Sequence, residues 1–257
     1  MAGATRFDDP LAVADEAAAL RQPLFVAFDI DGVLAPIVAH AADAALLPGA
    51  LDSLIELADV ATVGVVSGRA TGNLARFGFP ESFKMAGSHG AERRGVPFEP
   101  LTPTEARRLT RLRALADRAA IDAGPGSWVE IKPTGVVLHV RETKPEVGAK
   151  ALDDLAARAG SVPGASVKRG HAIVELTTRP ATKATAVSAM RLELPPGAVV
   201  FLGDDITDED VMVSLVEGDL GIRVGRGPTS AHRRLRNPRE VLAFVRRLVA
   251  GLNANRP

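Results

Sequence analysis

The sequence predicts an α/β protein in which a parallel sheet with helices on both faces is interrupted by a smaller α+β segment. Short apolar runs alternate with helical segments near both ends of the chain, which is the pattern of parallel strands joined by helices. Between them, pairs of alternating strands follow two long helices, as in an antiparallel sheet. We therefore expect a core formed by residues 1–96 and 179–257, and an inserted domain formed by residues 97–178.

The first part of the core begins with an apolar run that has the length of one strand. Residues 24–28 suit a strand that is buried on both faces. An amphipathic helix beginning at Pro48 comes next, followed by a second buried strand at residues 62–67. A short helix at 71–77 and a third strand at 84–87 complete this part of the pattern.

Two helices and two pairs of strands are expected in the inserted segment. Helices are predicted at 105–123 and at 145–160, the second of which ends in a glycine. Alternating apolar and polar residues predict strands at 128–132, 136–141, 166–169 and 172–176.

The pattern of the core returns near Lys183. Buried apolar runs again alternate with helical segments, which indicates that the chain re-enters the parallel sheet. The predicted elements are helices at 183–192, 207–216 and 238–252, and strands at 199–202 and 220–224.

The composition excludes several classes of protein. The chain has 257 residues, 31 basic and 31 acidic side chains and a formal net charge of zero, which argues against a nucleic-acid partner. It has no cysteine, so disulfides and zinc–thiolate sites are impossible. Acidic residues among the first twenty argue against a targeting peptide, and no apolar run reaches about 18 residues. We expect a soluble, cytoplasmic monomer with no nucleic-acid or membrane partner.

Asp29 and Asp31 lie where the first apolar strand ends, which is where ligands bind in open α/β sheets. One of two carboxylates at this spacing can attack phosphorus and form an aspartyl-phosphate, while the other transfers the proton of the leaving group. Together they can attract a divalent cation, which prefers oxygen ligands. By itself, the Asp-x-Asp-Gly pattern is equally compatible with an acidic turn that caps a strand.

A second acidic cluster, residues 204–210, follows a later buried strand. Five of its seven residues are acidic, and their mutual repulsion is costly unless a cation lies nearby. We assign Asp204 and Asp205 to a metal site. The remaining side chains suit the first turn of the next helix, where a hydroxyl can cap and acidic groups are stabilised by the helix dipole. These are Thr207, Asp208 and Glu209.

Two further segments supply groups that can bind phosphate. Ser67, Gly68 and Arg69 end the second apolar strand, where a hydroxyl and backbone N–H groups can hold phosphate oxygens. Lys183 lies where the chain returns to the core and can add a positive charge. Each group also has an ordinary structural interpretation, since Ser-Gly is a common turn. Their shared placement at strand ends or at the return to the core is the informative feature.

Together these residues resemble the four motifs of the haloacid-dehalogenase superfamily of phosphatases. The motifs occur in the order of that superfamily as Asp29-x-Asp31-Gly, Ser67, Lys183 and Gly203-Asp204-Asp205-x-x-Asp208. The resemblance implies a Rossmann-like core with a parallel sheet. It also implies that the inserted segment is a small α/β cap domain.

The resemblance assigns a role to each matching residue. Asp29 would be the nucleophile and Asp31 the general acid and base. Ser67 and Lys183 would bind the phosphoryl group that is transferred. The ligands of a Mg²⁺ ion would be Asp29, the backbone carbonyl of Asp31, and Asp204, with Asp205 or Asp208 in support.

A finer resemblance, which begins near residue 24, connects the chain with the trehalose-6-phosphate phosphatases. It implies that the substrate is a disaccharide phosphate, foremost trehalose 6-phosphate, and it adds Gly68, Arg69 and His89 to the substrate-binding residues. The matching segments are Asp29–Ile37, Ser67–Arg69, Gly87–Glu92, Val129–Pro133, Leu138–Arg141 and Gly203–Asp210.

The predicted strands of the inserted domain carry charged side chains on one face. Glu130 and Lys132 point to the same side of one strand, because side chains alternate along a strand. His139 and Arg141 do the same on the next strand, and Glu175 lies on a neighbouring one. The resemblance implies that these residues, apart from His139, bind sugar hydroxyls when the cap closes. The residues alone favour a solvated sheet face with cross-strand ion pairs.

Some positions depart from the pattern of the family. Thr177 stands where an arginine is usual, and Ala184 replaces a glycine. Related compounds are therefore alternative substrates, such as glycosylglycerate phosphates or validoxylamine-type pseudo-disaccharide phosphates. A mutase or phosphotransferase of the same superfamily is disfavoured by the position of the cap. A catalytically silent regulator that binds a sugar phosphate is a third hypothesis, although such a protein is expected to have lost catalytic residues that this chain keeps.

Overall fold

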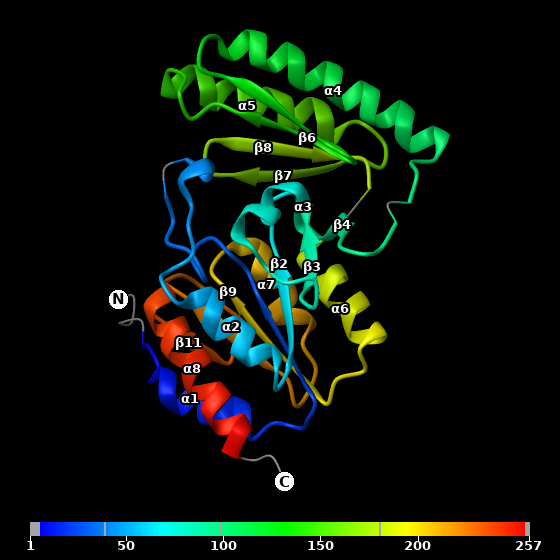
Figure 1. Cartoon of the computed structure of the whole chain (residues 1–257). Helices are drawn as coiled ribbons and strands as arrows, with labels where there is room; N and C mark the ends of the chain where they lie inside the picture. The colour runs from blue at the N-terminus through cyan, green and yellow to red at the C-terminus, as the bar shows by residue number, and fades with distance from the viewer. Residues whose placement is uncertain (1–5, 39, 98, 180, 255–257) are drawn as a thin grey trace. The chain divides into compact units, whose positions relative to one another are not determined.

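The computed structural model describes residues 6–38, 40–97, 99–179 and 181–254. The chain divides into two compact units (Figure 1), which are Met1–Val96 with Ala181–Pro257, and Pro97–Pro180. The second unit ends two residues beyond the boundary that the sequence predicts. Among the described residues, no helix combines the length and the apolar character needed to cross a membrane.

The described residues of the larger unit form a seven-stranded sheet. Its order is β11-β10-β9-β1-β2-β3-β4, and neighbouring strands are parallel except for β3 and β4. β1 is central because the chain adds β2 and β3 on one side of it and later adds β9 and β10 on the other. The strands are β1 (Leu24–Phe28), β2 (Thr62–Val66), β3 (Lys84–Gly87), β4 (Glu92–Arg93), β9 (Ala198–Gly203), β10 (Leu220–Val224) and β11 (Arg233–Leu235).

Helices cover both faces of this sheet (Figure 1). The side of β1 that carries Leu24, Val26 and Phe28 packs against α1, α2 and α8. The opposite side, with Phe25 and Ala27, packs against α6 and α7. The helices are α1 (Pro10–Ala18), α2 (Ala50–Ala58), α3 (Thr71–Leu74), α6 (Lys183–Glu193), α7 (Ile206–Ser214) and α8 (Pro238–Ala254), with 3-10 turns η1 (Ala41–Asp43), η2 (Ala75–Phe77) and η3 (Ser88–Gly90).

The described residues of the smaller unit form a four-stranded antiparallel sheet in the order β5-β6-β8-β7. Two helices cover one face (Figure 1), where Leu138 and Val174 pack with Leu112 of α4 and Leu155 of α5. The predicted fold class, a parallel α/β core with a small α+β insert, is therefore confirmed. The elements are α4 (Pro103–Ala123), β5 (Trp128–Lys132), β6 (Gly135–His139), α5 (Pro145–Gly160), β7 (Ser166–Gly170) and β8 (Ile173–Thr177).

The structure contains elements that the sequence pattern does not predict. β4 and β11 have two and three residues, which is too short for a hydrophobic period to be recognised. β11 carries Arg233 and Arg234 at the edge of the sheet, and Arg233 pairs with Glu16 of the unpredicted helix α1 at 2.7 Å. β6 ends at His139, so Arg141 lies outside the strand in which it is predicted.

Candidate active site

Three adjacent strands of the larger unit end with polar side chains at the same edge of the sheet. Asp29 follows β1, Ser67 follows β2 and Asp204 follows β9, and β1 runs parallel to both neighbours. The chain continues from β1 to α2 on one face of the sheet and from the neighbouring β9 to α7 on the other face, which is the arrangement at which open α/β sheets bind ligands. The fold therefore brings three of the predicted site residues to one edge.

Asp29 presents one bound and one open carboxylate oxygen. Its side chain is buried, and its backbone N–H donates to the carbonyl of Leu202 at 3.0 Å. Its Oδ2 pairs with Lys183 Nζ at 2.8 Å. Its Oδ1 is buried and has no hydrogen-bond partner among the described residues. Such an oxygen is costly unless an ion or a reacting group meets it, so Oδ1 is placed to act on a ligand.

Lys183 is the first residue of α6, and only 2% of its surface is exposed. Its Nζ donates to Asp208 Oδ1 at 2.7 Å and pairs with Asp29 on the other side. Thr182 caps α6 by accepting from the N–H of Thr185, which fixes where the lysine side chain starts. Burial lowers the pKa of Lys183, but the charges of Asp29 and Asp208 raise it above its usual range. The side chain therefore carries a fixed positive charge.

Asp29, Asp204 and Asp208 form a compact acidic group, in which one oxygen of each lies within 4.8 Å of the others. Lys183 supplies one positive charge, so two negative charges stay uncompensated whenever all three carboxylates are ionised. Burial is the main reason why the pKa of Asp29 rises to about 7 and the pKa of Asp204 to about 8. A divalent cation supplies two positive charges and prefers carboxylate oxygens, so these residues fit such an ion.

Gly32 allows the loop after β1 to approach Asp204. Its φ is +77°, a conformation that favours glycine, and a Cβ at this position would lie 2.0 Å from Asp204 Oδ2. The loop is closed by a hydrogen bond of 2.8 Å from the Gly32 N–H to the carbonyl of Ala35. The glycine of the Asp-x-Asp-Gly pattern is therefore needed because a larger residue would collide with Asp204.

The acidic residues after β9 make contacts that the sequence analysis does not predict. Asp205, predicted as a metal ligand, instead caps α7 by accepting from the N–H of Thr207 at 3.1 Å, and it lies outside the compact acidic group. The cap is therefore a carboxylate and not the Thr207 hydroxyl. Asp208, predicted only in support, is fully buried and belongs to the acidic group. Its Oδ2 accepts from the N–H groups of Asp204 at 2.9 Å and Asp205 at 3.0 Å. The Asp-x-x-Asp spacing of a capping box is the signal for this arrangement.

Asp31 faces Arg69 from the loop after β2. Arg69 donates through Nε to Asp31 Oδ2 and through Nη2 to Oδ1, both at 2.7 Å. This bidentate pair occupies both oxygens of the carboxylate. Ser67 is buried, and its Oγ accepts from the N–H of Arg69 at 3.2 Å. Two of the predicted phosphate-binding residues therefore form one turn beside Asp31.

His89 lies against Gly68 of the same turn. A Cβ on Gly68 would meet the imidazole of His89 at 2.8 Å, so the approach depends on the glycine. The N–H of His89 donates to the carbonyl of Ser67 at 3.0 Å. Glu92 supports this segment by accepting from the hydroxyl of Ser88. The structure therefore places His89 with the predicted phosphate-binding turn.

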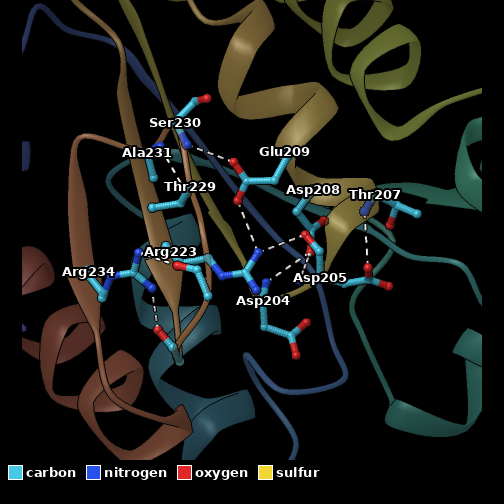
Figure 2. A network of polar contacts seen from close by, with 12 residues as sticks. Asp204, Asp205, Thr207, Asp208, Glu209, Arg223, Thr229, Ser230, Ala231 and Arg234 are labelled. Carbon is cyan, nitrogen blue, oxygen red and sulfur yellow. Dashed lines mark hydrogen bonds and ion pairs between the residues drawn. The ribbon is translucent and has the colours of Figure 1, made fainter. Parts of the chain in front are cut away.

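A buried arginine that sequence reasoning misses supports the acidic loop after β9 (Figure 2). Arg223 of β10 is 8% exposed, and its Nη1 donates to the carbonyl of Asp205 at 2.9 Å and to Glu209 Oε1 at 3.0 Å. Glu209 Oε2 accepts in turn from the N–H of Ser230 at 2.8 Å. These bonds hold the backbone from which Asp204 projects. An arginine within an apolar strand belongs to no motif, so the sequence gives little signal for it.

Replacing Arg223 with methionine is expected to weaken metal binding. Methionine keeps much of the side-chain volume but removes the bonds to Asp205 and Glu209. Groups that orient metal ligands typically contribute about 10–100-fold to affinity. Calorimetric titration of the wild-type and variant proteins with Mg²⁺ measures the loss. Arg247→Met is the matched control, because it removes a half-exposed ion pair with Asp15. Equal affinities of the Arg223 variant and the wild type would show that Arg223 does not position the loop.

Mg²⁺ is expected to stabilise the protein more at about pH 8.5 than at about pH 5.5. The carboxyl groups of the unfolded chain have pKa values of about 4, below the raised pKa values of Asp29 and Asp204. Between these pH values the metal-free folded protein therefore keeps protons that the unfolded chain has lost. The stability that these protons supply is present at low pH and is lost as pH rises from about 4 to about 8. In the same range the protons compete with the metal for the carboxylates.

Thermal denaturation with Mg²⁺ and with EDTA at both pH values measures this stabilisation. At high pH it should approach about 2.7 kcal/mol when the metal concentration is 100 times Kd. Asp204→Asn should reduce both the stabilisation and its pH dependence. An equal effect of Mg²⁺ at the two pH values would contradict the expectation.

The charged side chains predicted on one face of the smaller unit's sheet form two pairs. Lys132 and Glu175 are both buried, and Lys132 Nζ donates to Glu175 Oε1 at 2.8 Å. Glu130 Oε2 lies 3.1 Å from His139 Nε2, and this hydrogen bond is the main reason why the pKa of Glu130 is lowered. Arg141, predicted on the same face as His139, is exposed and lies beyond the end of β6.

The parallel sheet, the carboxylates at its strand ends and the buried lysine define a phosphatase of the haloacid-dehalogenase superfamily, and thus a phosphoric monoester hydrolase. The model of the trehalose-phosphatase family matches residues 27–237, and the chain belongs to this family. Both levels of the resemblance seen in the sequence are therefore confirmed.

Individual relatives agree with this assignment. The chain is 30% identical over 236 residues to the trehalose-6-phosphate phosphatase of Escherichia coli (strain K12), which covers 89% of this chain and 88% of that protein. Other curated relatives are longer, and the chain spans 17% to 62% of three of them.

Solved structures share the fold at lower identity. The C-terminal domain of a Candida albicans trehalose-6-phosphate phosphatase superimposes with a TM-score of 0.79 at 22% identity, covering 97% of this chain and 99% of that chain. The C-terminal domain of a Candida albicans trehalose synthase regulatory protein gives a TM-score of 0.71 at 12% identity, covering 95% and 100%. At these identities the likeness describes the fold alone.

Proposed function

We propose that the protein hydrolyses a disaccharide phosphate, foremost trehalose 6-phosphate, in a Mg²⁺-dependent reaction that passes through an aspartyl-phosphate on Asp29. The observation that carries this proposal is the open Oδ1 of Asp29, which is buried beside Lys183 and the acidic group. Membership of the trehalose-phosphatase family supports a sugar phosphate. The name of the Escherichia coli relative supports trehalose 6-phosphate in particular.

In the first step, Asp29 Oδ1 attacks the phosphorus in line with the leaving sugar oxygen. The bond between phosphorus and that oxygen breaks, and Asp31 supplies the proton that the oxygen needs. Lys183 keeps the other oxygen of Asp29 in place and offsets negative charge on the phosphoryl group. Ser67 lies in the turn beside Asp31 and can bind a phosphoryl oxygen.

In the second step, water attacks the phosphorus of the aspartyl-phosphate and gives a proton to Asp31. The bond from phosphorus to Asp29 Oδ1 breaks, which releases inorganic phosphate and restores the carboxylate. In the conformation described here, Arg69 holds both oxygens of Asp31. The guanidinium must therefore release one of them before Asp31 can transfer a proton, which gives Arg69 a part in turnover besides its predicted contact with substrate.

Mg²⁺ would be held by the carboxylates that lie close together, which are Asp29, Asp204 and Asp208. The backbone carbonyl of Asp31 remains a further ligand implied by the sequence motif. An ion held there would supply positive charge to offset that of the phosphoryl oxygens. Asp205 leaves the proposed ligand set because its carboxylate caps α7.

We propose that the smaller unit is the substrate-specificity cap. The Lys132–Glu175 and Glu130–His139 pairs supply charged donors and acceptors, the groups that fix the orientation of a polar ligand. Arg141, exposed beyond β6, stays a candidate for the same function. Sugar hydroxyls can exchange hydrogen bonds with these pairs, because each hydroxyl both donates and accepts.

A catalytically silent regulator that binds a sugar phosphate is the competing hypothesis from the sequence, and such a protein is expected to lack catalytic residues. Two features favour an enzyme: Asp29 and Lys183 are both present, and Lys183 joins Asp29 to Asp208. Thr177, which lies two residues after Glu175, and Ala184, which follows Lys183, still depart from the family pattern. Glycosylglycerate phosphates and validoxylamine-type phosphates are therefore the alternative substrates.

Release of phosphate from a panel of sugar phosphates, with Mg²⁺ and with EDTA, tests the proposal. We expect the highest kcat/KM for trehalose 6-phosphate and no turnover in EDTA. Inactivity on every member of the panel would refute the phosphatase. A clear preference for another glycosyl phosphate would overturn only the choice of substrate.

Glu130→Gln is expected to raise the KM for the disaccharide phosphate by about tenfold, because a hydrogen bond to a charged group contributes about 1.5 kcal/mol or more. The KM for p-nitrophenyl phosphate, which has no sugar, should stay unchanged. Lys150→Met is the control in the same unit, since Lys150 forms an exposed pair with Asp154 on α5. An equal rise in the KM values for both substrates would show that Glu130 does not act by binding the sugar.

A further inference from the structure

Trp128 and His139 form an aromatic stack on one face of the sheet in the smaller unit. The two residues lie opposite each other in the register of β5 and β6, and side chains of such neighbours are close enough to touch. Their rings are parallel to within 3°, and the ring centroids are 3.8 Å apart. The indole is therefore positioned by two strands of a sheet.

The imidazole that supports Trp128 is itself held in place. His139 Nε2 lies 3.1 Å from Glu130 Oε2, and this contact restricts the rotation of the ring. Glu130 follows Trp128 by two residues on β5, so both side chains point to the same face. Because the indole is ordered before any ligand arrives, a ligand that stacks on it loses less binding energy to the ordering of side chains.

Trp128 lies outside the hydrophobic cores and is far more exposed than the phenylalanine side chains that pack in the larger sheet. Its exposed fraction is 54%, whereas Phe25, Phe28 and Phe201 are fully buried. The cross-strand contact with His139 does not require the indole to stay in water. Exposed aromatic surface that is bordered by charged groups is a common feature of binding sites.

The neighbours of Trp128 indicate the chemistry of its ligand. Alternate residues of β5 place Trp128, Glu130 and Lys132 in one row, which offers an apolar ring, an acceptor and a donor. A hexopyranose presents C–H groups on its faces and hydroxyls around its rim, so it can use all three groups at once. An apolar ligand would have no use for the charged neighbours, whose burial against it would be costly.

We propose that Trp128 stacks on a hexopyranose ring of the substrate and selects sugar phosphates over phosphate esters that have no such ring. This inference rests on the proposed function, because it assigns a specificity residue to the same reaction. Ile131, which is 56% exposed on the same strand but points to the opposite face, has no such role.

Tryptophan fluorescence tests the contact directly, because Trp128 is the only tryptophan of the chain. Titration of the wild-type protein with trehalose, and of Asp29→Asn with trehalose 6-phosphate, should change the emission in a saturable way and protect it from quenching by acrylamide. Inorganic phosphate with Mg²⁺ should do neither. Unchanged emission, or a change without protection from acrylamide, would overturn the inference.

Steady-state kinetics gives a second test. Trp128→Ala should raise the KM for trehalose 6-phosphate about tenfold with little change in kcat, and should leave p-nitrophenyl phosphate unaffected. Trp128→Phe should restore most of the loss, because it keeps an aromatic ring, and Ile131→Ala should match the wild type. Equal KM values for the alanine variant and the wild type, while trehalose 6-phosphate is hydrolysed, would refute the role of Trp128 and leave the proposed function intact. Failure of the protein to hydrolyse any sugar phosphate would instead refute the proposed function, and the titration with trehalose would still test sugar binding.

Discussion

Replacing Asp29 with asparagine is expected to abolish phosphate release, with a loss in kcat on the order of 10⁴ or more. The amide has nearly the same shape as the carboxylate but cannot act as the attacking oxygen. Lys183 keeps its bond of 2.7 Å to Asp208, so the surrounding structure retains its counterion. Because one uncompensated negative charge is removed, the metal-free variant should be at least as stable as the wild type. Phosphate release and thermal denaturation measure the two effects separately.

The matched control is Asp52→Asn, which makes the same chemical change at an exposed position in the first turn of α2. It should keep the activity of the wild type. Full activity of the Asp29 variant would refute the aspartyl-phosphate mechanism. A loss of activity together with a large loss of stability would assign Asp29 a structural role and contradict the separation expected here.

The sequence was most informative where a strand is buried on both faces. The sequence predicts β1 with its observed bounds, because five consecutive apolar residues between Pro23 and Asp29 have few other structures available. α5 was predicted as Pro145–Gly160 for a similar reason, since proline favours the first turn and glycine the end of a helix. β11 was missed because its pairing with β10 comes from tertiary structure and leaves no period in three residues.

The sequence likewise indicates some residues of the candidate site, whereas the placement of others is decided only by the folded structure. The sequence indicates Asp29, Ser67 and Lys183 as candidates because each stands at the boundary of a predicted element. The different placement of the Asp205 and Asp208 carboxylates is not predictable from acidic composition. It depends on which carboxylate turns to the N-terminus of α7 and which turns to Lys183, and only the folded backbone decides this.

Lys183→Met is expected to lower both stability and activity, because two buried carboxylates lose their counterion. Lys183 Nζ lies 2.8 Å from Asp29 Oδ2 and 2.7 Å from Asp208 Oδ1, and methionine replaces neither contact. Removal of one partner from a buried ion pair typically costs about 3–5 kcal/mol of unfolding free energy. The loss of a charge that stabilises the phosphoryl group should lower kcat by about 10²–10³ or more. Urea denaturation in EDTA and phosphate release in Mg²⁺ measure these changes.

A second substitution separates the two effects. Asp208→Asn in the Lys183→Met background removes one of the unpaired charges, while the amide oxygen can still accept from a backbone N–H of the acidic loop. The double variant should therefore recover part of the lost stability. It should recover no activity, because the positive charge beside Asp29 is still missing. If the double variant is as unstable as Lys183→Met alone, unpaired charge is not the cause of the instability, and the cause then lies in the packing of Lys183 at the start of α6.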